Sequence, residues 1–123
     1  IMALPDLDSP TKVEGKNVIV ASVPTSASGV LENASGSSKT LRLSSIYASN
    51  IDGTNSADVT SYIVDNTVSA SGYLAKDISV PAKSTLLPLT KDANIYLDEN
   101  QTLYVQASVA DDICVIVSYE EIS

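Results

Sequence analysis

Carboxylates are the side chains of this sequence that could bind a metal ion or exchange protons, because the chain contains no histidine and one cysteine. Zinc and iron sites depend on histidine or cysteine ligands, so we expect neither metal. Calcium prefers oxygen ligands, and Asp52, Asn55 and Asp58 lie within one short segment, DGTNSAD. Their spacing is not that of an EF-hand loop, and the distal bidentate glutamate is missing. We therefore interpret these residues as solvated turn carboxylates and predict no metal and no cofactor.

Neighbouring carboxylates occur at Asp98-Glu99, Asp111-Asp112 and Glu120-Glu121. A glycosidase needs two carboxylates that face each other across a sugar, usually in a cleft lined by aromatic rings. The chain contains no Trp and no Phe to line such a cleft. Its serines have no histidine base, and neither a G-x-S-x-G elbow nor the lysine of a P-loop is present. The sequence therefore predicts that the protein is not an enzyme.

The single cysteine, Cys114, lies in the apolar segment ICVIVSY. One cysteine cannot form an internal disulfide, and a catalytic thiolate would need a histidine partner that the chain lacks. Free cysteine behaves as a small hydrophobic residue. We predict a buried structural thiol.

The net charge is −8, from 7 basic and 15 acidic residues. Nucleic-acid binding requires a basic patch that displaces counterions from phosphates, and here lysine and arginine are scattered singly. The same acidity opposes binding to an anionic membrane surface. No run of apolar residues is long enough to span a bilayer, and the first residues lack the basic and apolar regions of a signal peptide. We expect neither nucleic acid nor membrane as a partner.

Residues 95–119 show the clearest structural pattern. Leu103, Val105, Ala107 and Val109 alternate with polar residues, and the segment from Ile113 to Tyr119 alternates in the same way. Successive side chains of a strand point to opposite faces, so each aliphatic set lies on one face of a sheet. The turns at 98–100 and 110–112 are short, so we predict an antiparallel meander of three strands in one central sheet.

The remaining chain alternates short apolar runs with turn-forming residues. Both the aliphatic composition and this punctuation favour strands over helices. A change of alternation within 39–50 indicates either a β-bulge near Ser44 and Ser45 or a strand buried on both faces. Pro88 excludes a helix interior or a central strand from the connection 81–92. The predicted strands cover residues 17–23, 30–32, 39–50, 58–68, 73–80, 95–97, 101–109 and 113–119.

These strands predict an all-β fold, an antiparallel two-sheet β-sandwich resembling a jelly roll, with about eight strands. We expect one domain over residues 16–123, preceded by an extended N-terminal arm over residues 1–15. Pro5, Pro10 and isolated apolar residues characterise the arm. Either it is a disordered tail, or Leu4 and Leu7 dock on a neighbouring subunit.

Three stretches of the chain resemble small virion structural proteins of tailed bacteriophages, especially those of cyanobacteria. The stretches are RLSSIYASNIDGTNSADVTSYIVD, YLAKDISVPAKSTLLPL and IYLDENQTLYVQASVADDICVIVSYEEIS. The motifs that carry the resemblance are β-hairpin patterns at Ile46 to Asn50, Asp52 to Asn55, Ile78 to Thr85, Ile95 to Ser108 and Val117 to Ile122. The similarity covers roughly residues 39–123 and leaves the arm outside. It implies a β-sandwich with a non-enzymatic role in the virion and contributes no catalytic residues.

From this resemblance we expect a capsid decoration (cement) protein on the surface of the virion. It would dock on the major capsid protein as a homo-oligomer, with a trimer as our guess, because many weak contacts add up over a symmetric shell. A tail, neck or baseplate accessory protein is an alternative of the same class. A carbohydrate-binding module for host-surface glycans is an alternative of another class, with Tyr47, Tyr62 or Tyr104 stacking on sugars.

Overall fold

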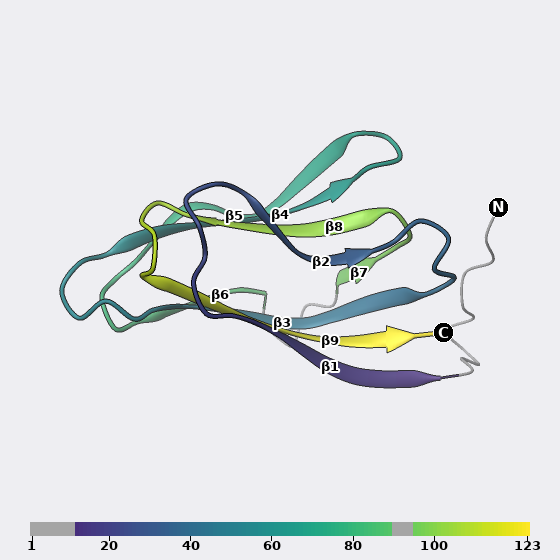
Figure 1. The fold of residues 1–123 in the computed structure, drawn as a ribbon, viewed down its shortest axis with the longest axis horizontal. Coiled ribbons are helices and arrows are strands. Elements are labelled where there is room, and N and C mark those ends of the chain that lie inside the picture. Colours follow the sequence, from purple (N-terminus) through teal and green to yellow (C-terminus); the bar gives the residue numbers. More distant parts are fainter. Residues whose placement is uncertain (1–11, 90–94) are drawn as a thin grey trace.

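The computed structural model describes residues 12–89 and 95–123, which form an all-β sandwich (Figure 1). None of these residues is helical, so the described part of the chain contains no helix that could cross a membrane. The nine strands are β1 (Val13–Val20), β2 (Ser28–Asn33), β3 (Thr40–Asn50), β4 (Ala57–Asp65), β5 (Ala70–Val80), β6 (Thr85–Leu89), β7 (Ile95–Leu97), β8 (Gln101–Ala107) and β9 (Ile113–Ile122).

The strands form two antiparallel sheets that face each other. Sheet A has the order β1-β9-β3-β6, with β7 also paired to β3, and sheet B has the order β2-β8-β4-β5. Most consecutive strands pass from one sheet to the other, and β4 and β5 form a hairpin within sheet B (Figure 1). This is the strand order of a jelly roll. The predicted two-sheet, antiparallel fold is confirmed.

The predicted meander over residues 95–119 is wrong. β8 pairs with β2 and β4 in sheet B, whereas β7 and β9 belong to sheet A. The alternation of aliphatic residues determines which face of a strand is buried, but it does not determine the neighbouring strand. Two packed sheets lie only about 10 Å apart, so a turn of a few residues can cross between them as readily as it closes a hairpin. Asn100 and Asp111, both with positive φ, lie in these two turns.

The core lies between the sheets and follows the predicted alternation. Leu103 and Val105 of sheet B and Val115 and Val117 of sheet A are all 0% exposed. In β3, Leu43 and Ile46 are both buried although their parities differ. The register between β3 and β9 shifts between Leu43 and Ser45, which confirms the bulge predicted there and explains the change of parity.

Most predicted strand ends are shifted by one to four residues in the structure, and two differences change the assignment of a segment. The connection 81–92 contains a strand, β6, and its Pro88 is tolerated because β6 is an edge strand whose register shifts at this point. The strand β1 begins at Val13, so residues 13–15 belong to sheet A and not to an arm. Leu4 and Leu7, the predicted docking residues of the arm, lie outside the described residues.

Buried asparagines tie the two sheets together at opposite ends of the sandwich. Asn33, at the end of β2, donates its amide to the carbonyl oxygens of Lys39 and Leu97 at 2.8 and 2.9 Å. Asn50, at the end of β3, donates to the carbonyl oxygens of Asn55 and Val80, both at 2.9 Å. Each asparagine is 2% exposed, and each joins a strand of one sheet to a strand of the other. These bonds satisfy backbone carbonyls where the ladders end.

Candidate functional site

The acidic turn near Asp52 is held by its own hydrogen bonds. The carboxylate of Asp52 accepts the backbone N–H of Thr54 at 2.9 Å and the side-chain amide of Asn55 at 3.4 Å. Asp58 lies in β4, where its backbone N–H donates to the Ser108 hydroxyl at 2.8 Å. The described residues contain no group of three or more His, Cys, Asp or Glu side chains placed to hold a metal ion. The geometry is that of a polar turn.

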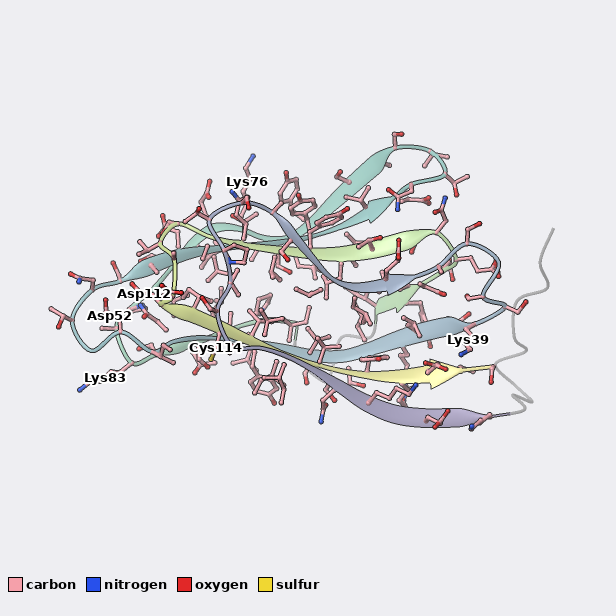
Figure 2. The ribbon with its side chains drawn as sticks, in the orientation of Figure 1. Lys39, Asp52, Lys76, Lys83, Asp112 and Cys114 are labelled. Atoms are coloured by element: carbon pink, nitrogen blue, oxygen red, sulfur yellow. The ribbon has the colours of Figure 1, made fainter. Side chains whose placement is uncertain are left out.

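Asp52 and Asp112 form a contact at one end of the sandwich (Figure 2). Partial desolvation, together with the charge of Asp52, raises the pKa of Asp112 above its ordinary value. The hydrogen bond from the Thr54 backbone lowers the pKa of Asp52. Asp112 is therefore the carboxylate of the pair that is protonated first as the pH falls. Both carboxylates are partly exposed to solvent, so the contact resembles a turn carboxylate pair more than a catalytic dyad.

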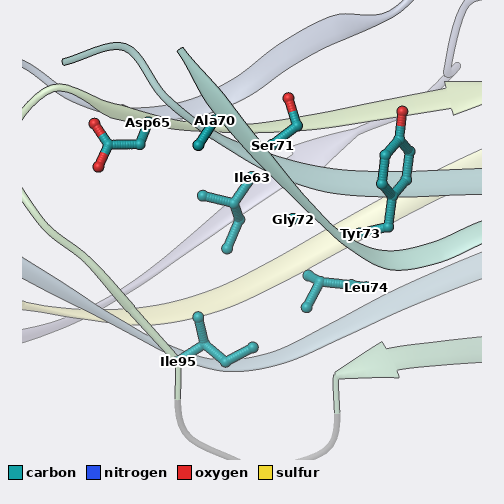
Figure 3. Close-up of a pocket in the computed structure, with 8 residues that line it drawn as sticks. All are labelled: Ile63, Asp65, Ala70, Ser71, Gly72, Tyr73, Leu74 and Ile95. Atoms are coloured by element: carbon teal, nitrogen blue, oxygen red, sulfur yellow. The ribbon is translucent and has the colours of Figure 1, made fainter. Parts of the chain in front are cut away.

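A hollow of about 460 Å³ lies under the end of the β4–β5 hairpin (Figure 3). The side chains of Ile63, Leu74 and Ile95 gather in it, whereas the ring of Tyr73 points away. Among its described lining residues, the one carboxylate is Asp65, which accepts bonds from the Thr67 N–H and the Gln101 amide. The lining is apolar and offers no pair of groups for acid–base chemistry.

Cys114 is half-buried, not buried as predicted. Its neighbours Ile113 and Val115 are both 0% exposed and face the core, so Cys114 points toward the outer face of sheet A. It lies opposite Ser49 of β3. The exposure of Cys114 therefore follows from the alternation of inward and outward side chains along β9.

The outer face of sheet A carries four exposed apolar side chains in one line, which we call the apolar row: Ile19, Ile116, Tyr47 and Leu87. Ile19 lies opposite Ile116, and Ile116 lies opposite Tyr47, so the row crosses β1, β9 and β3. Leu87 follows on β6, at the register shift opposite Tyr47. These side chains are 72%, 40%, 42% and 41% exposed, respectively. They form a continuous apolar strip on a rigid sheet.

No charged residue lies within the apolar row or directly beside it in the described sheet. The next outward positions along β9 are Cys114 and Ser118, and those along β3 and β6 include Ser49 and Thr85. Ser49 and Thr85 hydrogen-bond each other at 3.0 Å. The nearest ion pair on this face joins Arg42 to Glu120, two positions beyond Ser118 on β9. The row is therefore apolar and uncharged in a chain of net charge −8.

The outer face of sheet B carries a different line of side chains, the tyrosine row: Tyr104, Tyr62 and Tyr73. They lie directly opposite one another on β8, β4 and β5. The rings of Tyr62 and Tyr104 are stacked with centroids 5.3 Å apart, and those of Tyr62 and Tyr73 are tilted at 5.0 Å. Rings that stack across strands cover each other's faces, so Tyr62 has little free face for a ligand.

Both ends of the tyrosine row are covered as well. The ammonium group of Lys76 lies 5.2 Å from the centre of the Tyr73 ring, on the outer side of sheet B (Figure 2). At the other end, Gly29 of β2 lies opposite Tyr104, and a Cβ added there would lie 3.5 Å from the tyrosine ring. The ring therefore packs over a glycine of the edge strand.

Of the three tyrosines predicted to bind sugars, the structure brings two together and places the third on the other sheet. Tyr62 and Tyr104 stack on each other in sheet B, whereas Tyr47 lies in sheet A as part of the apolar row. Sequence reasoning missed Tyr73, which is 52% exposed. It also missed Ile19 and Ile116. The signal was present, because Ile116 interrupts the alternation of ICVIVSY with an apolar residue at an outward position.

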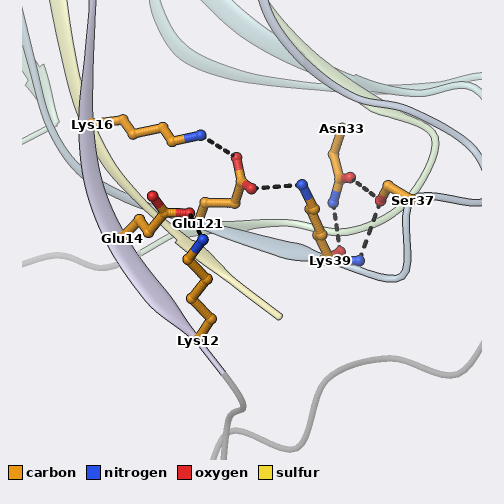
Figure 4. A network of polar contacts seen from close by, with 7 residues as sticks. All are labelled: Lys12, Glu14, Lys16, Asn33, Ser37, Lys39 and Glu121. Atoms are coloured by element: carbon orange, nitrogen blue, oxygen red, sulfur yellow. Dashed lines mark hydrogen bonds and ion pairs between the residues drawn. The ribbon is translucent and has the colours of Figure 1, made fainter.

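A network of ion pairs joins β1, β9 and the start of β3 (Figure 4). Glu121 accepts hydrogen bonds from Lys16 at 2.9 Å and from Lys39 at 2.6 Å. The bonds from Lys39 and Lys16 lower the pKa of Glu121, and the bond to Glu121 raises the pKa of Lys16. Glu14, opposite Glu121, pairs with Lys12 at 3.2 Å.

The chain matches no model of a known protein family, and no curated protein sequence matches it.

Proposed function

We propose that the chain is a non-enzymatic virion structural protein, most simply a capsid decoration protein that docks on the major capsid protein through the outer face of sheet A. The observation that carries this proposal is the apolar row, which crosses four strands and is 40–72% exposed. Contiguous exposed apolar strips of this kind usually mark interaction sites. The resemblance of residues 39–123 to phage virion proteins supports the choice of partner.

The geometry of the row suits attachment to a large, repeated surface. Its side chains stand on neighbouring strands of one sheet, so binding orders few flexible elements. Aliphatic and tyrosine side chains without charged neighbours resemble the core of a protein interface, which is depleted of charge. One such contact is weak, but copies arranged on a symmetric shell add their contacts.

The carboxylates favour this role over catalysis. Asp52 is held in a turn, Glu121 is held by two lysines, and Asp65 accepts two hydrogen bonds at the hollow. Each of these groups has a structural partner. They therefore contribute to folding and solubility in this proposal.

Binding to particles tests the docking face. Purified chain is incubated with heads of its phage that lack it, and bound chain is measured after sedimentation. We expect Ile116→Lys to weaken binding at least about tenfold, because it places a charge at the centre of an apolar contact. The matched control is Val68→Lys, at a turn residue that is 67% exposed and outside both rows. Equal binding by wild type and Ile116→Lys would reject the docking face.

The N-terminal arm is tested in the same assay. Deletion of residues 2–10 removes both predicted arm contacts, Leu4 and Leu7. If the arm is the anchor, the truncated chain loses binding while Ile116→Lys retains it.

Gold labelling of intact virions distinguishes a head protein from a tail, neck or baseplate protein. Label over the whole head indicates decoration, and label at one vertex indicates a tail, neck or baseplate protein.

A glycan-binding module is the second candidate, and the tyrosine row is the observation that favours it. Because Tyr62 is covered on both sides, a sugar would have to displace Lys76 and stack on the outer face of Tyr73. A glycan array probed with wild type and with Tyr73→Ala is the test. Signal that disappears in Tyr73→Ala supports glycan binding, and consistent silence of the wild type rejects it.

A further inference from the structure

The four edges of the two sheets differ in how well they resist pairing with another strand. At the edges formed by β2 and β5 the pairing register shifts, and Asp77 of β5 has positive φ. The edge formed by β6 and β7 carries Pro88 and another register shift, and β7 is only three residues long. Bulges, proline and short strands are the usual devices that prevent edge-to-edge association.

The edge formed by β1 has none of these devices. Its eight residues pair with β9 without a register shift, and they contain no proline and no residue with positive φ. Val13 and Ile19 of this strand are 48% and 72% exposed. Among the described strands β1 pairs with β9 alone, so it is a long, regular edge to which a further strand can pair.

The backbone groups that this edge presents can be identified. Lys12 and Ser123 exchange two hydrogen bonds, N–H to carbonyl at 3.0 and 2.9 Å. In an antiparallel pair the residues bonded to the partner alternate with residues whose groups point away. The regular register then directs Glu14, Lys16 and Val18 toward β9. The N–H and C=O groups of Val13, Gly15, Asn17 and Ile19 point outward from the sheet.

The charged residues of β1 do not prevent a further strand from pairing with this edge, because they are of opposite sign. Glu14 lies directly opposite Glu121 on β9, an unfavourable like-charge pair. Lys16 and Lys39 both bond to Glu121, whereas Glu14 has the more exposed Lys12. A positive charge on a strand beyond β1 would therefore be stabilised beside Glu14.

We propose that β1 pairs antiparallel with β1 of a second copy of this chain, about a two-fold axis at Gly15. In this register the outward groups of Val13 bond to those of Asn17 in the second copy, and Gly15 pairs with its own equivalent. Glu14 then lies opposite Lys16 of the second copy, and Lys16 opposite Glu14, giving two cross-strand ion pairs. Registers centred on Glu14 or Lys16 would instead place identical charges opposite each other. The charge pattern of β1 is thus complementary to itself in one antiparallel register.

The dimer has a consequence for the apolar row. A two-fold axis between adjacent strands of one sheet is perpendicular to that sheet, so the two sheets A become one continuous sheet with their outer faces on the same side. The two apolar rows then form one docking face of doubled length. The inference does not rest on the proposed docking to capsids, because self-association is measured on the purified chain.

Sedimentation velocity of the full chain tests the interface. We expect a two-copy species whose dissociation constant is in the micromolar range, since an interface of one strand pair is small. Glu14→Lys and Lys16→Glu should each weaken self-association at least about tenfold, because each variant places like charges opposite each other. An equimolar mixture of the two variants should dimerise again, with both ion pairs restored. A monomeric wild type at concentrations up to about 1 mM, a three-copy species, or a mixture that stays monomeric would each overturn the proposal.

A backbone variant provides an independent measurement. The N–H of Asn17 points outward, so Asn17→Pro removes two hydrogen bonds from the dimer, one for each copy, and leaves the ladder to β9 intact. We expect a chain with unchanged circular dichroism that sediments as a monomer. The matched control is Val68→Lys, which should dimerise as the wild type does. A folded Asn17→Pro variant with wild-type self-association would contradict the proposed edge, and the charge exchange decides the matter if this variant does not fold.

Discussion

The outer faces of the two sheets differ although the sheets share one core. The outer face of sheet A carries the apolar row, whose side chains are 40–72% exposed and whose neighbouring outward positions on the described strands are uncharged. The outer face of sheet B carries the tyrosine row, whose rings stack on each other and end at Lys76 and at Gly29. The edge strands of the two sheets differ as well. β1 of sheet A pairs with its neighbour without a register shift, whereas the registers of β2 and β5 of sheet B shift.

The two rows differ in whether their side chains are buried within the molecule or left for a partner. Tyrosines that stack across strands bury part of their surface within the molecule, so they stabilise sheet B without a partner. The isoleucines of the apolar row, Ile19 and Ile116, leave 72% and 40% of their surface in water, and a partner could bury this surface. The exposure of the two rows is therefore consistent with the proposed attachment through sheet A and with internal support by the tyrosine row. The following variants test this distinction, beginning with the core that both sheets share.

Truncation of a core leucine should cost the same in either sheet. Leu43 of sheet A and Leu103 of sheet B are both 0% exposed. Removal of either side chain leaves a cavity, so we expect Leu43→Ala and Leu103→Ala each to lower the free energy of unfolding by about 3 kcal/mol. Urea denaturation followed by circular dichroism measures both. Two separate transitions, or a large loss in one variant alone, would show that the sheets do not share a single cooperative core.

Substitution of the buried asparagines should cause the second largest loss of stability. Asn33→Ala and Asn50→Ala each leave two carbonyl oxygens without their amide donor, at opposite ends of the sandwich. We expect each variant to lose about 2 kcal/mol of stability. Asn→Asp at the same positions serves as control, since it keeps the volume but lacks the donor and should be at least as destabilising. An Asn→Ala variant as stable as the wild type would mean that the link between the sheets at that end of the sandwich does not contribute to stability.

The two outer rows should respond in opposite ways. Tyr62→Ala removes the central ring of the tyrosine row and should cost about 1.5 kcal/mol. Ile116→Ala changes a partly exposed side chain and should cost less than about 0.5 kcal/mol while it weakens particle binding. Thermal unfolding and the sedimentation assay are measured on both variants. The comparison between the faces fails if Tyr62→Ala is neutral, or if Ile116→Ala destabilises the fold as strongly.

The ion pairs at the end of sheet A should give the smallest effect and a defined pH dependence. The folded-state pKa of Glu121 lies below its ordinary value of 4.5, so its contribution is present above that pH and is lost as the pH falls through the folded-state pKa. Glu121→Gln should cost about 1 kcal/mol at pH 7, because the lysines are well exposed. Stability is measured from pH 7 down to pH 3. A difference from the wild type that persists in acid would assign the effect to packing.

The sequence predicts the buried faces of the strands but not which strands are neighbours. Alternation in Leu103–Ala107 and Ile113–Val117 predicted which side chains are buried, and the change of parity in β3 predicted its bulge. The same alternation did not predict that β8 and β9 belong to different sheets. Turn length carried no information on this point, because a hairpin and a crossing between sheets need similar numbers of residues.

What the sequence alone determined is local: strands, their buried faces, and the scarcity of groups for metal binding or catalysis follow from residue types and from the two-residue period of a strand. The tertiary structure decided which strands are neighbours, and with that which exposed residues share a face. Ile19, Tyr47 and Ile116 are far apart in the chain, and Tyr62 and Tyr104 likewise, so only the pairing of strands brings each set together. Sheet order is a property of long-range contacts, and for that reason the two outer surfaces could not be read from the alternation of the strands that form them.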